Sequence, residues 1–225
     1  LEDLLAIVAL ESQRNRCMVI GEDLGTVADE LRAALARRDV LSYKLLWFER
    51  DAQGEFKRPE AYAHKALVAI STHDLATLAG WWSGEDLLVR LELGLYPTRE
   101  AYEHQLADRA EDRRRLLRAL HGAQLVDGHA DSEISQEVVL SFDLLLATHA
   151  FIAKTPARVM MVQLEDALGV TDQANMPATV NEHPNWRRKL PLALEQIAAD
   201  PRIAALIGML AAERPRAPPK GSDGS

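Results

Sequence analysis

Acidic side chains follow three of the apolar segments in this sequence. Glu22 and Asp23 follow residues 17–21, Asp74 follows residues 66–70, and Glu165 and Asp166 follow residues 158–162. If these segments are parallel strands, their carboxyl ends meet at one edge of a sheet, and the carboxylates meet there too. Carboxylates gathered in this way can transfer protons, attack as nucleophiles or bind divalent cations. Each acid alone could instead cap the helix or turn behind it, but three in register with strand ends favour a shared site.

Longer motifs surround these acids, and together they resemble one enzyme family. They are Val19-Ile-Gly-Glu-Asp-Leu-Gly25, Ser71-Thr-His-Asp74 with Thr77, Gly80, Trp81 and Trp82, Leu164-Glu-Asp166, Gln173-Ala-Asn-Met-Pro177 and Asn185-Trp-Arg-Arg188. In order and approximate spacing they resemble the amylomaltases, the 4-α-glucanotransferases of glycoside hydrolase family 77, over about residues 8–212. The resemblance implies a barrel of the α-amylase kind and retaining transfer of α-1,4-glucan segments between malto-oligosaccharides. We expect neither a cofactor nor a metal.

The resemblance also implies roles for three residues. By position, Glu22 matches the general acid/base, Asp74 the transition-state stabiliser and His73 the histidine that contacts the sugar beside it. Breaking a glycosidic bond requires a proton on the leaving oxygen and negative charge near the oxocarbenium-like carbon. We expect these three side chains at the same end of neighbouring parallel strands, facing one open cleft that Glu165 or Asn175 borders.

Four further residues are candidates for binding the sugar. Trp81 and Trp82 could form an aromatic wall that excludes water and stacks on sugar faces, although packing in the core is an equally fair interpretation. Glu49, at the end of residues 41–48, could bind a sugar hydroxyl or be a surface acid. Asn175 could bind sugar or shape its loop.

Two features depart from the family pattern. Such enzymes carry a nucleophilic aspartate in an arginine-containing motif one barrel strand earlier, and none of the residues before Glu22 forms it; Asp3 lies in a predicted helix. The first residue is Leu1 and not Met, so we expect the nucleophile in a missing N-terminal half of the same enzyme, and an inactive isolated chain. Ala178 stands where the family often has glycine.

Two alternatives belong to other classes. The acids Glu22, Asp23, Asp74, Glu165 and Asp166 could form the site of a divalent-metal-dependent barrel enzyme. The chain could also be a non-catalytic half barrel that binds glucan without converting it.

Hydrophobic patterning predicts the elements that position these residues. Residues 17–21, 41–48, 66–70 and 158–162 are expected strands, residues 1–14 an amphipathic helix, and residues 85–150 a mostly helical insertion before the last strand. Pro201 is expected to start a closing helix, whereas residues 214–225 are expected to be a disordered tail. The predicted fold is α/β, with residues 1–213 forming the C-terminal half of a (β/α)8 TIM-type barrel. A small doubly wound sheet is the alternative, and no glycine-rich nucleotide-binding motif supports it.

Composition excludes several classes. The 225 residues are 48% hydrophobic, enough for a sizeable core, and carry a formal net charge of -8. This charge disfavours partners such as nucleic acid and anionic membranes. The acidic, arginine-rich run at residues 107–120 is expected to be a solvated helix face. The single cysteine, Cys17, cannot form an internal disulfide, which favours a cytoplasmic location, and its apolar neighbours predict that it is buried.

Overall fold

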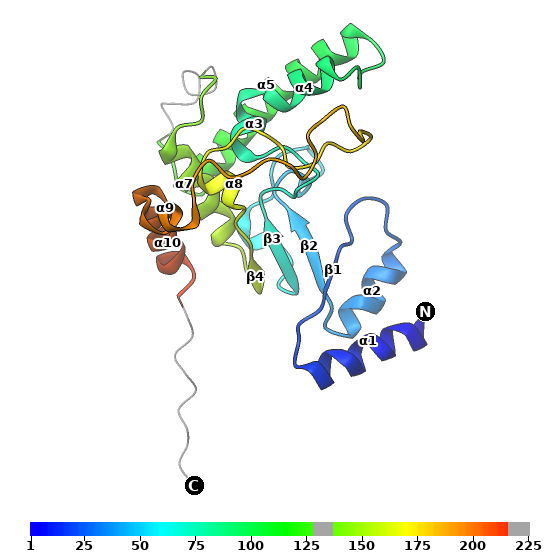
Figure 1. Cartoon of the computed structure of the whole chain (residues 1–225). Coiled ribbons are helices and arrows are strands. Elements are labelled where there is room, and N and C mark those ends of the chain that lie inside the picture. The colour runs from blue at the N-terminus through cyan, green and yellow to red at the C-terminus, as the bar shows by residue number, and fades with distance from the viewer. Residues whose placement is uncertain (128–136, 216–225) are drawn as a thin grey trace.

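A four-stranded parallel sheet forms the centre of the computed structural model, which describes residues 1–127 and 137–215 (Figure 1). Its strands are β1 (Ile20–Gly21), β2 (Leu41–Leu45), β3 (Ala66–Ala69) and β4 (Val159–Met160). They lie side by side in chain order, with Gly21 opposite Ser42, Leu45 opposite Ala69 and Val68 opposite Met160. The predicted parallel α/β architecture is confirmed. A doubly wound sheet reverses its strand order at a switch point, and the described strands show no reversal.

Helices connect and flank the strands. They are α1 (Glu2–Asn15), α2 (Asp29–Arg37), the 3-10 turn η1 (Pro59–Ala61), α3 (Leu78–Ser83), α4 (Glu85–Glu92), α5 (Arg99–Gly122), α7 (Phe142–Ala153), α8 (Leu164–Ala167), α9 (Leu194–Ala199) and α10 (Pro201–Glu213). In Figure 1, α1 and α2 lie beside β1, whereas α9 and α10 lie beyond β4. The expected helical insertion between β3 and β4 is present as α4, α5 and α7. In the described parts of the chain, no helix is both long and apolar enough to cross a membrane.

Alternate residues of β3 build the core on its two faces, as the period of a strand requires. Ala66 and Val68 pack into the larger hydrophobic cluster, which Trp82 and Phe151 share. Leu67 and Ala69 point the other way and form a smaller cluster with Leu45. Both faces of β3 are therefore buried, as in a central parallel strand.

The edge of the sheet at β1 differs from expectation. Only Ile20 and Gly21 pair with β2, so the strand is shorter than predicted. Cys17 is exposed, and the prediction that it is buried is wrong. The reason is position: Cys17 follows the left-handed cap of α1 at Arg16 and precedes the paired residues, so no neighbouring element covers it.

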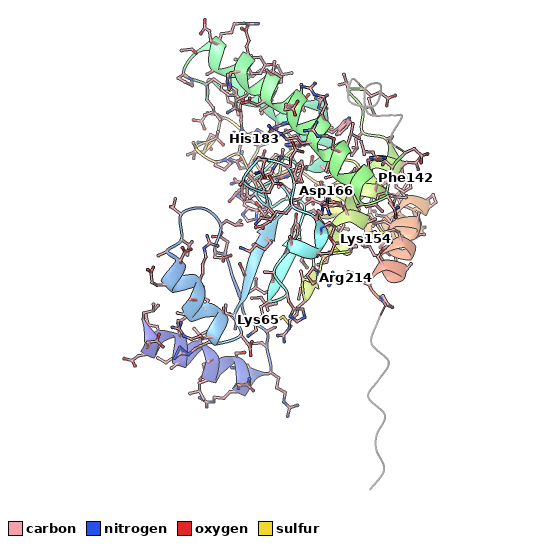
Figure 2. All side chains as sticks on the ribbon, turned by 180° about the vertical axis from the view of Figure 1, so that it is seen from behind. Lys65, Phe142, Lys154, Asp166, His183 and Arg214 are labelled. Carbon is pink, nitrogen blue, oxygen red and sulfur yellow. The ribbon has the colours of Figure 1, made fainter. Side chains whose placement is uncertain are left out.

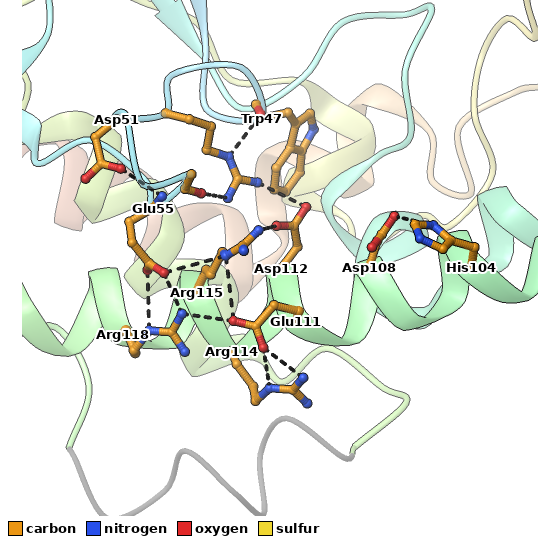
Figure 3. Close-up of polar contacts among 12 residues, drawn as sticks. Trp47, Asp51, Glu55, His104, Asp108, Glu111, Asp112, Arg114, Arg115 and Arg118 are labelled. Atoms are coloured by element: carbon orange, nitrogen blue, oxygen red, sulfur yellow. Dashed lines mark hydrogen bonds and ion pairs between the residues drawn. The ribbon is translucent and has the colours of Figure 1, made fainter.

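The charge run of α5 was expected to be a solvated face, and that prediction holds only in part, because Asp108, Arg114 and Arg118 are exposed whereas Arg109 is not. Arg109 pairs with Asp86 at 2.7 Å, with 11% and 6% of the two side chains exposed. Further along the helix, Asp112 pairs with Arg50, and Arg118 pairs with Glu55 (Figure 3). The connection between β2 and β3 packs on α5 through Arg50 and Glu55, so this part of the charge run has ionic partners and does not face solvent alone.

The ordered contacts of the C-terminal region extend one residue further along the chain than predicted, to Arg214. Pro201 occupies the first turn of α10, as expected, and the Asp200 side chain accepts a hydrogen bond from the Arg202 backbone N–H. The Arg214 guanidinium donates hydrogen bonds to the carbonyl oxygens of Ala153 and Thr155 at the end of α7. Figure 2 shows Lys154 and Arg214 near one another here. The prediction of a disordered tail over residues 214–225 is therefore wrong for Arg214. Residues 216–225 lie outside the described part of the chain.

Candidate active site

Glu22 lies directly after β1, and a buried neighbour holds its loop. The Glu22 side chain is exposed, and its Oε1 accepts a hydrogen bond from the Leu24 N–H at 2.7 Å. Asp23 is buried and accepts hydrogen bonds from the Ser42 hydroxyl at 2.6 Å and the Tyr43 N–H at 2.9 Å. Burial raises the pKa of Asp23, but the bonds from Ser42 and Tyr43 outweigh it, so this pKa is below its ordinary value. Asp23 thus ties β1 to β2, whereas Glu22 remains exposed to solvent.

His73 and Asp74 follow β3, with both side chains about half exposed. His73 Nε2 lies 3.3 Å from Asp74 Oδ2. The Asn175 side chain donates a hydrogen bond to Asp74 Oδ1 at 2.6 Å, and the Asn175 N–H donates to the His73 carbonyl at 3.0 Å. The structure therefore brings together three residues that the sequence named for the site.

Gln173 also belongs to this cluster and was not among the predicted site residues. Its side chain is buried, and its amide nitrogen donates to the Asp74 carbonyl at 2.9 Å and to the Asn175 carbonyl at 2.5 Å. One amide group thus joins the loop after β3 to the loop that carries Asn175. Its place in the motif Gln173-Ala-Asn-Met-Pro177 was the available signal, but position alone does not reveal that it is buried.

Helix α3 secures the second of these loops. The Thr77 hydroxyl donates to the Val170 carbonyl at 2.6 Å. Gly80 approaches the Thr171 carbonyl so closely that a β-carbon would collide with it. The contact explains why glycine stands at this point in the motif after Asp74.

Asp166 joins α8 to the start of α3. It is almost fully buried, and its Oδ1 accepts a hydrogen bond from the Leu78 N–H at 2.6 Å. Burial raises the pKa of Asp166 to about 7, and the neighbouring Glu165 charge acts in the same direction. Lys65, just before β3, and Asp166, just after β4, mark the two ends of the sheet in Figure 2. Of the paired acids after β4, Asp166 therefore has a structural position and Glu165 borders the site.

Two cavities lie at this end of the sheet. One of about 510 Å³ is lined by His73, Glu165 and Trp186, and one of about 340 Å³ by Asp23, Tyr43 and Glu49. Glu49 pairs with Lys57 at 2.8 Å, so its carboxylate already has a partner. A larger cavity, about 810 Å³, lies elsewhere, between residues 51–61 and the ends of α5 and α7, and no predicted site residue lines it.

Glu22 and Asp74 lie at the same end of the sheet, as expected. They were also expected on neighbouring strands, and they are not. Strand β2 separates β1 from β3, which corresponds to about 10 Å between strand axes. Asn175 contacts Asp74, and Glu165 lines the neighbouring cavity with His73. Neither cavity at this end of the sheet is lined by Glu22 and Asp74 together.

The two tryptophans of α3 lie in the core. Trp82 is fully buried, and Trp81 stacks on Trp47 with ring centroids 4.3 Å apart. Neither ring has a face available to a sugar in this structure, so of the two open interpretations the structure favours core packing over an aromatic wall. The apolar side chains of α3 are buried because they pack in the same hydrophobic cluster as Ala66 and Val68 of β3.

The acids considered for a metal site are not gathered into one. Asp23 is engaged by Ser42, Tyr43 and Arg32, and Asp166 by Leu78. Among residues 1–127 and 137–215, no group of three or more acids, histidines or cysteines has the geometry to hold a metal ion.

Comparison with known proteins decides the family. A family model described as 4-alpha-glucanotransferase matches residues 1–194. The chain belongs to the 4-alpha-glucanotransferase family. It is 37% identical over 194 residues to the 4-alpha-glucanotransferase of Haemophilus influenzae, covering 85% of this chain and 27% of the relative. It is 37% identical over 216 residues to that of Mycobacterium bovis, covering 90% and 28%. The chain thus spans little more than a quarter of the length of these members of the 4-alpha-glucanotransferase family.

Solved structures of amylomaltases are similar to this chain. Amylomaltase from Corynebacterium glutamicum superimposes with a TM-score of 0.84 at 28% identity, covering 92% of this chain and 30% of that one. Amylomaltase from Streptococcus agalactiae, solved in complex with acarbose, gives a TM-score of 0.51 at 19% identity, covering 86% and 31%, and supports the fold alone.

Proposed function

We propose that this chain is the C-terminal part of a retaining 4-alpha-glucanotransferase, which moves α-1,4-glucan segments between malto-oligosaccharides. The observation that carries the proposal is the placement of Glu22 and of the Asp74 cluster at one end of a parallel sheet, in a member of the 4-alpha-glucanotransferase family. Glu22 is the general acid/base and Asp74 the stabiliser of the transition state.

The local geometry suits these two roles. Glu22 is exposed beside β1, so its carboxyl group can reach a glycosidic oxygen, first to donate a proton and then to accept one from the incoming sugar hydroxyl. Asp74 has one oxygen held by Asn175 and the other beside His73. A carboxylate fixed in this way is preorganised to hold sugar hydroxyls while positive charge develops on the ring.

We further infer that the sheet is part of a (β/α)8 barrel whose remaining strands come from an upstream segment. The sequential strand order and the coverage of the relatives support this. The upstream segment would also supply the nucleophile. Asp3 is not a candidate because it lies in α1, away from the carboxyl ends of the strands.

The proposal is tested by disproportionation of maltotriose in the full-length enzyme that carries this chain. Replacing the acid/base group lowers such rates by roughly a hundredfold to ten-thousandfold, so Glu22→Gln and Asp74→Asn should each remove at least a hundredfold of activity. Glu30→Gln, which changes an exposed carboxylate of α2, is the matched control and should retain the parent rate. Parent-like activity in Glu22→Gln would refute the assignment.

The non-catalytic alternative makes a different prediction. A glucan-binding protein would take up maltoheptaose in calorimetric titration but release no transfer products from it, with or without Glu22.

A further inference from the structure

Trp186 differs from the other tryptophans of the chain. Trp81 and Trp82 are buried, and Trp47 stacks on Trp81, whereas 65% of Trp186 is exposed. Single exposed apolar residues are common and need no explanation by themselves. Trp186 is unusual because it lines a cavity beside the candidate catalytic residues: its ring centroid lies 5.0 Å from that of His73.

The backbone holds Trp186 in this exposed position. Its φ angle is 60°, in the left-handed region that bulky residues rarely adopt. Its N–H donates to the Ala174 carbonyl at 3.0 Å. The preceding Asn185 accepts a hydrogen bond from the Met176 N–H and donates one to the Thr179 hydroxyl, both at 2.8 Å. Strained conformations that neighbouring bonds enforce are concentrated at ligand-binding sites.

The cavity beside Trp186 suits an uncharged, hydroxyl-rich ligand. Its charged lining is balanced, with two acids and two cations: Glu165, Asp172, Arg188 and Lys189. Arg188 and Asp172 already pair with each other at 3.0 Å, which disfavours binding of a phosphate or another anion. Gln163 also lines the cavity, and its buried Oε1 accepts no hydrogen bond from the described residues. A ligand hydroxyl could supply the missing donor. The volume of about 510 Å³ falls within the range of roughly 300–1,000 Å³ that is common for ligand sites.

From these observations we propose that Trp186 and this cavity form a subsite for a glucosyl unit next to the one held by His73 and Asp74. The apolar face of a glucose ring stacks on the indole, while its hydroxyls bond to the polar lining. This inference rests on the proposed function and adds to it a determinant of glucan chain length.

The test compares Trp186→Ala and Trp186→Phe in the full-length enzyme. Loss of an aromatic contact weakens binding modestly, so Trp186→Ala should raise the KM for maltoheptaose about fivefold, equivalent to about 1 kcal/mol. The kcat should change little, because the platform binds the ground and transition states equally. Trp186→Phe should recover most of the affinity. Val180→Ala, which removes an exposed side chain from the same loop, is the control and should keep the parent KM.

A second readout does not require the alanine variant to fold. In the parent enzyme, acrylamide should quench Trp186 fluorescence, and maltoheptaose should protect it; both signals should be absent from Trp186→Phe. If the parent transfers glucan but Trp186→Ala keeps the parent KM, or maltoheptaose gives no protection, the subsite is refuted and the proposed function stands. If the parent neither binds nor transfers glucan, both are refuted.

Discussion

At the scale of single residues, the site depends on side chains whose roles differ more than their types suggest. Glu22 and Asp23 are adjacent acids, yet one is exposed and the other is buried between β1 and β2. Glu165 and Asp166 differ in a similar way after β4, since Asp166 is buried and Glu165 is partly exposed. In each pair, the buried acid is held by hydrogen bonds from a neighbouring element, and the other acid is more exposed to solvent.

Ala178 provides a test of backbone strain at this scale. Its φ angle is 69°, a left-handed conformation that costs a residue with a β-carbon roughly 1–2 kcal/mol. The family that the sequence resembles often has glycine here, and the left-handed geometry supplies a reason. Ala178→Gly should raise the free energy of unfolding of the full-length enzyme by up to about 1 kcal/mol, because part of the relief is offset by the greater entropy of glycine in the unfolded chain. Urea denaturation measures this, and a loss of stability would contradict the strain argument.

At the scale of elements, charged side chains of helix α5 bind two other parts of the chain: helices α3 and α4, and the connection after β2. Arg109 binds Asp86 and the Trp81 carbonyl, and thereby joins α5 to α4 and α3. Glu55, in the connection after β2, binds Arg118 of the same helix (Figure 3). These bonds position α3, which in turn supports the loop of Asn175.

The buried pair should be far more important for stability than an exposed pair on the same helix. Arg109→Ala leaves the Asp86 carboxylate buried without its partner, which costs roughly 3–5 kcal/mol. Arg99→Ala breaks an i,i+4 pair with Glu103 in which both side chains are mostly exposed, and should cost less than about 1 kcal/mol. Equal urea midpoints for the two variants would show that the buried pair has no special role.

Asp166 gives the contact between α8 and α3 a pH dependence. Its pKa is raised to about 7 from the ordinary 3.8, because burial favours the neutral form. The folded state therefore binds this proton more tightly than the unfolded state, and the stabilisation is lost as pH rises from about 4 to about 7. Asp166→Asn keeps an oxygen that can accept from the Leu78 N–H but does not ionise.

The variant should accordingly show a flatter stability profile over this range and be more stable than the parent at neutral pH, by at most roughly 4 kcal/mol. Thermal unfolding measured at several pH values provides the comparison. The same slope in both proteins would mean that Asp166 does not titrate in this range.

The elements were largely predictable from the sequence, but their contacts were not. Apolar segments and the residues that follow them indicated four strands, and a helical period indicated the insertion. The same method placed the charges of α5 in solvent, because a run of Arg and Glu looks the same whether it faces water or a partner segment. It placed Cys17 in the core because periodicity does not show which strand lies at an edge. Among the site residues, motif positions identified His73, Asp74 and Asn175, whereas the role of Gln173 depends on a contact between loops far apart in sequence.

At the scale of the whole molecule, the sheet has two edges with which no described strand pairs. Strands β1 and β4 each pair on one side only. Leu4, Ile7 and Leu10 of α1 are exposed, and a cavity of about 510 Å³ between β4 and α10 is lined by Met160 and Ile207, among others. Exposed strand edges beside apolar surface favour association with another chain segment.

The chain expressed alone should therefore bind a hydrophobic dye such as ANS and aggregate on heating. Supplying the proposed upstream segment should reduce both effects, because its strands would pair with these edges. A soluble monomer of the isolated chain with a sharp, reversible thermal transition would count against this account.

The most direct test of the central claim is reconstitution of activity from parts. Maltotriose is incubated with this chain alone, with the upstream segment alone, and with both, and the formation of glucose and longer malto-oligosaccharides is followed by chromatography. We expect transfer products only when both parts are present, and their loss when the chain carries Glu22→Gln. Activity of the isolated chain at the rate of the full-length enzyme, or full activity of the upstream segment without it, would contradict the claim that Glu22 and Asp74 complete an active site whose nucleophile lies elsewhere.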